Sequence, residues 1–177
     1  MGYLESIENV LTRDFSTSPR EVKDRTARDV IEICSLACAG LTLQPIPGIE
    51  QAIGPIQAGM VLAVAHVFGQ EITRKRAREI VMDLAAITGV NIVGRQVLLT
   101  LTKLVLPGLG GVLTAPYAFS VTWATGHAAV HYLASGGRPD RERIRKVFEE
   151  ERERSKAHYS EEKAKANRPS EKENPRR

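Results

Sequence analysis

Two long stretches of this chain carry no ionised side chain, and they limit its fold more than any other feature. The first spans residues 51–70, and the second spans residues 104–137, where 34 consecutive residues include no Asp, Glu, Lys or Arg. A helix without a charged face does not remain bare in water, because exposing apolar surface is unfavourable. Lipid, a second subunit or other helices of the same chain must therefore cover both stretches.

Apolar residues recur at three- and four-residue steps in much of the chain, which is the period of an amphipathic helix. The pattern is clear in residues 2–15, 73–88 and 90–105. The valine-rich runs lack the strict alternation that a half-buried strand requires. We expect an all-α fold, a helical bundle of about five to six helices with a Gly/Ala-rich helical hairpin and an extended charged C-terminal helix.

Prolines, glycines and shifts in charge divide the chain into four parts around one core domain. Ser18, Pro19 and Glu21 form a helix-start signal, because a capping residue is followed by a first-turn proline and then by a glutamate. The expected parts are an N-terminal amphipathic helix at 1–18, a helical core domain at 19–137, a charged helix at 138–166 and a disordered tail at 167–177.

Length and composition point in different directions on how the uncharged stretches are covered. A helix over residues 109–134 would be about 39 Å long, enough for a hydrocarbon layer of about 30 Å. The chain as a whole is 42% hydrophobic and 26% charged, with a mean hydropathy of −0.21. Those values favour a soluble or peripherally bound protein. Integration in a bilayer, peripheral association and a soluble bundle remain three alternatives.

Basic and aromatic residues mark the surface that would meet a membrane or a partner. Arg74, Lys75 and Arg76 occupy the first turn of the helix over residues 73–88, where the helix dipole disfavours cations. An anionic membrane surface or an acidic partner would compensate, and solvation by water is the alternative. Phe119 and Trp123 form an i,i+4 aromatic pair of the kind found at membrane interfaces. We predict that these five residues face a membrane or a partner.

Two pairs of metal-ligand residues share a helical spacing. His127 and His131 are four residues apart, and so are Cys34 and Cys38. Two helices brought together could therefore offer a tetrahedral Cys2His2 site. The competing interpretation places the histidines in an aromatic packing face and the cysteines in the core, and on it we expect no bound metal.

No arrangement in the sequence indicates catalysis or nucleic-acid binding. The chain contains no paired carboxylates, no serine elbow and no base beside a nucleophile, so we expect a protein that is not an enzyme and needs no cofactor. Residues 138–177 hold 14 basic and 10 acidic residues, and because both signs are mixed we expect no nucleic-acid partner. With two cysteines in an apolar run, we expect a cytoplasmic protein, with the inner face of the plasma membrane as an alternative location.

Several motifs together resemble a known bacterial family. They are "PIPGIEQAIGPIQAGMVLAVAHVFGQEITRKRAREIV", the later Arg95 and Lys103, "LPGLGG" and "TGHAAVHYLASGG". In this order they resemble the YcjF-type domain of unknown function, which occurs alone or behind a small GTPase domain, and the match covers about residues 34–137. The resemblance implies a helical, often membrane-associated domain without established catalytic residues, and an association with a GTPase. No phosphate-loop motif occurs in this chain, so the GTPase would be a separate chain.

The sequence therefore favours a non-enzymatic helical scaffold or adaptor that is membrane-associated or oligomeric. A protein partner or self-association is expected, and an anionic membrane surface and a GTPase are further candidate partners. The alternative is a soluble helical interaction subunit that docks into a larger assembly through its charged C-terminal helix.

Overall fold

The fold is helical throughout the residues that the structure, a computed structural model, describes: 3–44, 49–90, 110–136 and 138–169. Seven α-helices and no strand lie in these ranges, which confirms the predicted all-α bundle. The α-helices are α1 (Tyr3–Thr12), α2 (Arg20–Thr42), α3 (Ile53–Val67), α4 (Arg74–Thr88), α6 (Gly110–Ala134), α7 (Arg141–Arg154) and α8 (Glu161–Ala166). Two 3-10 helices, η1 (Ile49–Ala52) and η2 (Ser155–Ala157), complete the described elements.

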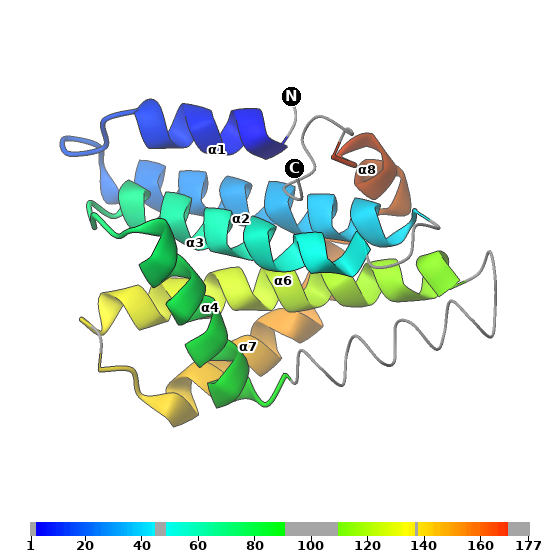
Figure 1. Cartoon of the computed structure of the whole chain (residues 1–177). Coiled ribbons are helices and arrows are strands. Elements are labelled where there is room, and N and C mark those ends of the chain that lie inside the picture. The colour runs from blue at the N-terminus through cyan, green and yellow to red at the C-terminus, as the bar shows by residue number, and fades with distance from the viewer. Residues whose placement is uncertain (1–2, 45–48, 91–109, 137, 170–177) are drawn as a thin grey trace.

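Three helices form the centre of the bundle. Figure 1 shows α2, α3 and α6 side by side, with α1 above them and with α4 and α7 crossing on the opposite side. The most extensive helix–helix contact joins α2 to α6, while α7 packs on α6 and α4 packs on α3. α8 lies against α2. Each of the two uncharged helices, α3 and α6, is thus enclosed by helices on several sides.

Cover for the uncharged helices comes from the chain itself. In α3, ten residues are buried, including Met60, Val61 and Val64. α6 buries Ala118, Phe119 and a run of small residues that includes Ala124 and Ala128. Among the described residues, no helix combines the length and the apolarity needed to cross a membrane.

Small residues let α6 approach its neighbours closely. A Cβ atom on Gly126 would lie 2.6 Å from Cγ1 of Ile31, so α2 and α6 meet here at a distance that only glycine permits. Between α3 and α6, the Gln57 side-chain amide donates a buried hydrogen bond of 3.1 Å to the hydroxyl of Thr122. A satisfied buried pair of this kind favours one alignment of the two helices, because any shift would leave polar atoms unpaired.

The charged C-terminal segment is not the extended helix that the sequence predicts. α7 ends at Arg154, η2 follows, and Ser160 caps a separate α8 by accepting the N–H of Lys163. Ile144, Phe148 and Ala164 are buried, because α7 packs on α6 and α8 packs on α2. The prediction of a single extended helix at 138–166 is therefore wrong: the few apolar residues of this segment bring it back onto the bundle.

Some sequence predictions fall on residues outside the described ranges. These are the helix over residues 90–105 with Arg95 and Lys103, the Pro-Ile-Pro-Gly element, and residues 170–177 of the expected disordered tail. The first three residues of that tail are described, and there the Asn167 side chain donates to the carbonyl of Lys163 while Pro169 is buried. At the other end, α1 packs on α3 and α2 and buries Tyr3 and Ile7.

Candidate functional site

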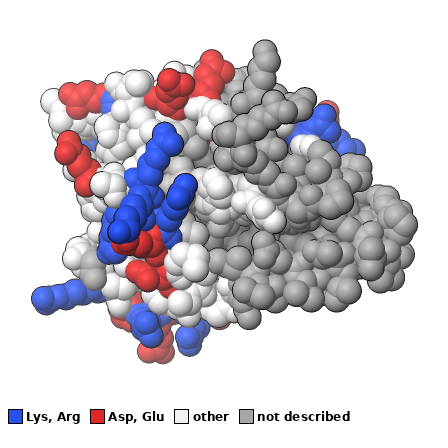
Figure 2. Space-filling model, in the orientation of Figure 1, with Lys and Arg blue, Asp and Glu red and all other residues white. Residues whose placement is uncertain are grey.

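The first turn of α4 presents a cluster of exposed basic residues. Its capping residue Thr73 accepts the N–H of Arg76 at 3.1 Å, which fixes where the helix begins. The apolar stripe of α4 faces the bundle, and Ala77, Ile80 and Leu84 are buried. The opposite side of α4 therefore faces solvent. It carries four exposed cationic residues: Arg74, Lys75, Arg76 and Arg78. Figure 2 shows Lys and Arg side chains gathered over this helix.

The acidic residues of this face have partners of their own. Glu79 forms an ion pair with Arg76 at 3.1 Å, and Asp83 accepts a 2.8 Å hydrogen bond from the hydroxyl of Tyr132 on α6. Burial raises the pKa of Tyr132, and the hydrogen bond to Asp83 adds to the effect, so the phenol stays a donor. Within the described part of the chain, Arg74, Lys75 and Arg78 form no ion pair.

A shallow, open depression lies among these side chains. It has a volume of about 430 Å³, and its lining consists of Arg74, Lys75, Arg78, Glu79, Met82 and Asp83. Met82 is 60% exposed, the most exposed of the large apolar side chains that the structure describes. Guanidinium and ammonium groups bind phosphate and carboxylate oxygens, and the positive end of the α4 dipole adds to their field. The cationic side chains of the depression are thus suited to bind an anionic surface.

Phe119 and Trp123 do not face outward. Phe119 is fully buried and Trp123 is 5% exposed, because α7, η2 and the turn after them cover this side of α6. The two rings stack with centroids 5.7 Å apart, and Tyr159 meets Phe119 edge-on at 5.6 Å. The structure corrects their predicted position: the protein's own C-terminal segment occupies the place expected for a membrane or a partner.

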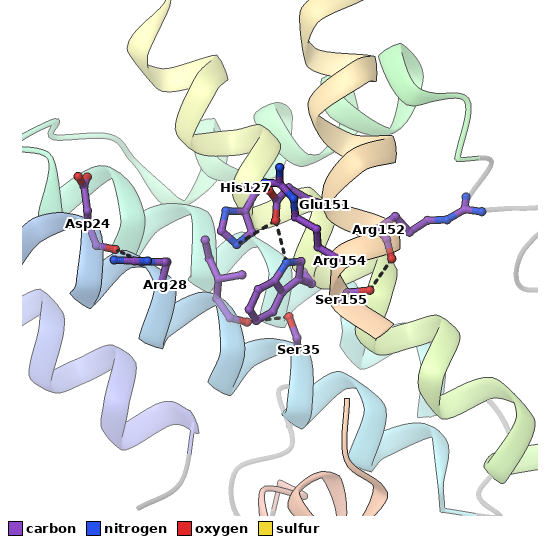
Figure 3. Close-up of polar contacts among 10 residues, drawn as sticks. Asp24, Arg28, Ser35, His127, Glu151, Arg152, Arg154 and Ser155 are labelled. Carbon is purple, nitrogen blue, oxygen red and sulfur yellow. Dashed lines mark hydrogen bonds and ion pairs between the residues drawn. The ribbon is translucent and has the colours of Figure 1, made fainter. Parts of the chain in front are cut away.

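A single carboxylate, Glu151 of α7, holds α7 to this aromatic cluster. Its Oε2 accepts the indole N–H of Trp123 at 3.1 Å, and its Oε1 accepts a 2.6 Å bond from Arg154 (Figure 3). Burial raises the pKa of Glu151, but the hydrogen bonds from Trp123 and Arg154 outweigh that effect and hold the pKa below the ordinary value. The carboxylate is therefore ionised at neutral pH.

His127 lies beside this carboxylate without a hydrogen bond to it. Nε2 of His127 is 3.8 Å from Oε2 of Glu151, and that nitrogen is buried without a hydrogen-bond partner. Burial lowers the pKa of His127, and it outweighs the opposing effect of Glu151. The His127 side chain is therefore held in its neutral form at neutral pH. On the far side of the cluster, the ring of His158 stacks on Trp123 with centroids 4.6 Å apart.

The Cys2His2 site does not form. The side chains of Cys34 and Cys38 are buried in the core of the bundle, and burial raises the pKa of Cys34, which disfavours the thiolate that binds metals. His127 is directed toward α7, and His131 lines a separate depression with Arg138 and Arg143. No group of three or more His, Cys, Asp or Glu residues within the described ranges could hold a metal ion.

Glu151, Arg154 and His158 complete the cluster and were not predicted from the sequence. For Glu151, a signal was present in the spacing of the C-terminal segment. Ile144, Phe148, Glu151 and Ser155 follow one another at steps of four, three and four residues, which places them on one face of a helix. A helix with such a face packs against the bundle, so Glu151 between two buried neighbours is expected to be an inward-facing acid.

No protein-family model, curated protein or solved structure matches this chain. The resemblance to the YcjF-type domain, and the GTPase association that it implies, therefore rest on the quoted motifs alone.

Proposed function

We propose that this protein is a non-enzymatic helical adaptor that binds an anionic membrane surface through the basic face of α4. The observation that carries the proposal is the set of three exposed cations, Arg74, Lys75 and Arg78, that have no ion-pair partner among the described residues. Their acidic neighbours Glu79 and Asp83 are bound to Arg76 and Tyr132. A layer of lipid phosphates would supply the missing counter-charges.

The expected affinity is that of a reversible peripheral contact. Each Lys or Arg near an anionic leaflet contributes about 1 kcal/mol, so the three unpaired cations contribute about 3 kcal/mol. Salt screens such attraction over about 8 Å at physiological ionic strength, so binding should weaken as salt is added. Insertion of the exposed Met82 side chain would add apolar contact with the lipid.

Other modes of association have less support on the described surface. Among the described residues, the exposed large apolar side chains are Leu4, Val22, Met82 and Tyr117, which lie on four different helices, so no one of these helices carries an exposed apolar stripe for self-association. Docking through a projecting charged helix loses its basis, because α7 and α8 pack on α6 and α2. A separate GTPase chain as partner rests on the sequence resemblance.

Sedimentation with lipid vesicles tests the proposal. We expect the full chain to pellet with phosphatidylcholine vesicles containing about 30% phosphatidylserine, and not with pure phosphatidylcholine. Replacing Arg74, Lys75 and Arg78 with Gln should weaken binding by about 100-fold, since three contributions of about 1 kcal/mol are lost. The matched control changes Lys156, Lys163 and Lys165 to Gln, which removes equal charge from side chains that already have ion-pair partners.

Two results would overturn the membrane partner. One is equal binding to the charged and the uncharged vesicles. The other is an equal loss of binding in the α4 variant and in its charge-matched control, because that would mean that net charge alone governs the interaction. If no vesicle binds but an acidic polypeptide such as polyglutamate does, and the α4 variant loses that binding, then the partner of this face is an acidic protein.

A further inference from the structure

A second depression, separate from the one on α4, lies where α6 ends and α7 begins. It has a volume of about 260 Å³, and side chains from both helices contribute to its lining. Three of the lining residues are basic: His131 on α6, Arg138 just before α7, and Arg143 on α7. The membrane contact proposed for α4 uses none of these residues.

The two arginines of this depression are exposed, and neither guanidinium has an ion-pair partner among the described residues. Two other arginines of α7 are different. Arg145 donates to the carbonyl of Ile87, and Arg154 pairs with Glu151. Positive charges that face one hollow repel each other, so an anion placed between them is bound favourably.

The acidic residue of the lining, Asp140, is already bonded to the start of α7. Its Oδ1 accepts the backbone N–H groups of Glu142 at 3.0 Å and of Arg143 at 3.1 Å. These N–H groups are therefore taken, and a ligand would be held by side chains instead of by the helix end. The Ser135 hydroxyl is taken too, since it donates to the carbonyl of Tyr132 at 2.6 Å. The side-chain donors left for a ligand are the two guanidinium groups and one imidazole.

These donors match a phosphate group. A guanidinium binds phosphate oxygens through two parallel N–H bonds. A phosphomonoester has three terminal oxygens and a charge of about −1.5 to −2 near neutral pH, whereas a carboxylate has two oxygens and a single charge. The hollow is smaller than the pockets of about 300 to 1,000 Å³ that enclose drug-sized ligands, so its size suits one anionic group.

We propose that this depression, the α6–α7 site, binds a phosphomonoester group between Arg138 and Arg143, with His131 as a third donor. The group belongs to a soluble compound or to a lipid headgroup, and the two sources are distinguished below. The α6–α7 site shares no residue with the basic face of α4, so it stands or falls independently of the proposed membrane binding.

Proton NMR of the full chain tests the site, because the chain has only 4 histidines and one of them lines it. We expect the ring C–H signals of His131 to move as inorganic phosphate is added at constant pH. The signals of His158, which stacks on Trp123, should stay in place. Sodium chloride at the same ionic strength should not reproduce the movement. The spectrum of His131→Gln assigns the signals.

Substitutions identify the groups that hold the phosphate. Arg138→Gln and Arg143→Gln should each weaken phosphate binding by about tenfold, because each removes a charged hydrogen-bond donor. The matched control is Arg141→Gln, which removes an equal charge from the first turn of α7 at a residue outside the lining. Binding to this control should be nearly unchanged, since salt screens an exposed charge that does not touch the ligand.

Vesicles identify the source of the phosphate group. Phosphatidic acid carries a phosphomonoester headgroup, whereas phosphatidylserine carries a phosphodiester. If a lipid supplies the group, the chain should bind phosphatidic acid vesicles more tightly than phosphatidylserine vesicles of equal surface charge, and Arg138→Gln should remove the preference. Binding of inorganic phosphate without that preference assigns the site to a soluble phosphomonoester.

His131 signals that stay fixed in phosphate, or that move equally in sodium chloride, would overturn the α6–α7 site. So would phosphate binding that survives in both arginine variants, or that is lost equally in the Arg141→Gln control. If an arginine variant does not fold, the wild-type comparison of His131 with His158 still decides. The triple Gln variant of the α4 basic face should keep its response to phosphate, which separates a failure of this site from a failure of membrane binding.

Discussion

The first turn of α4 and the α7–α8 segment are both strongly charged in the sequence, yet only the second uses some of its charges to bind other helices. Three charged groups of α7–α8 do so: Glu151 accepts a hydrogen bond from Trp123, Lys163 pairs with Glu32 of α2, and Arg145 donates to the carbonyl of Ile87 at the end of α4. In α4, Arg74, Lys75 and Arg78 have no such partner among the described residues. Charge density is therefore a poor guide to where a partner is needed.

The difference arises from the apolar residues placed between the charges. α7 carries Ile144 and Phe148 on the face that also holds Glu151, so burying these side chains brings the carboxylate inside. Exposed ion pairs are worth at most about 1 kcal/mol, whereas burying one Phe side chain contributes about 1.5 to 3 kcal/mol. On the outer face of α4 the corresponding apolar residue is Met82, which remains exposed.

The largest expected effect is the loss of the fold when residues 139–177 are deleted. Without α7 and η2, the fully buried Phe119 and the nearly buried Trp123 would face water. We expect the truncated chain to aggregate or to lose its cooperative thermal transition, as measured by circular dichroism and gel filtration. The triple Gln variant of Lys156, Lys163 and Lys165 should keep that transition. A truncated chain that melts as sharply as the full chain would show that the C-terminal segment is an appendage after all.

A pair of single substitutions sharpens the contrast between the two helices. Phe148→Ala removes a buried ring from α7 and should lower the free energy of unfolding by about 3 to 5 kcal/mol. Met82→Ala shortens an exposed side chain on α4 and should change it by less than about 0.5 kcal/mol. Urea unfolding followed by Trp123 fluorescence measures both. Similar losses in the two variants would mean that α4 buries its outer face against something in the chain.

Glu151→Gln tests the carboxylate that joins α7 to α6. At pH 7 the variant should be less stable by about 1 to 3 kcal/mol, the cost of weakening a largely buried, charge-assisted hydrogen bond. The folded pKa of Glu151 lies below its ordinary value of 4.5, so its contribution is present above that pH and is lost as the pH falls through the folded pKa. Urea midpoints of wild type and variant should converge under acid. A constant gap between them would assign the effect to packing instead of charge.

The smallest stability effect, and of the opposite sign, is expected at the basic face. Changing Arg74, Lys75 and Arg78 to Gln removes two cations, Arg74 and Lys75, from the first turn of α4, where the helix dipole makes each cost about 0.3 kcal/mol or more at low salt. The variant should therefore be slightly more stable than wild type while it loses binding to anionic vesicles. Thermal melts at low and high salt measure the gain, which should shrink as salt is added. A clear loss of stability would mean that these cations have partners within the fold.

Helical periodicity made most of the secondary structure predictable. The capped helix beginning after Thr73 buries Ala77, Ile80, Val81, Leu84 and Ile87, the same stripe that its spacing indicates. The C-terminal segment was harder, because only Ile144, Val147 and Phe148 stand out among its charges. A few buried contacts are enough to dock a helix, but a sequence does not say whether a matching surface exists. For the same reason the positions of Phe119 and Trp123 could not be inferred without knowing what covers them.

Periodicity and the cost of exposing apolar surface are local properties, so the order of residues was enough to infer a helical chain whose two uncharged segments require cover. What supplies the cover in the described helices, and which charges are thereby engaged, followed from the packing of those helices on one another. Packing α7 on α6 placed Glu151 between Trp123 and His127, while it left the cations of α4 exposed. Which side chains become neighbours depends on how distant helices meet, and that is set by the shape of the whole bundle.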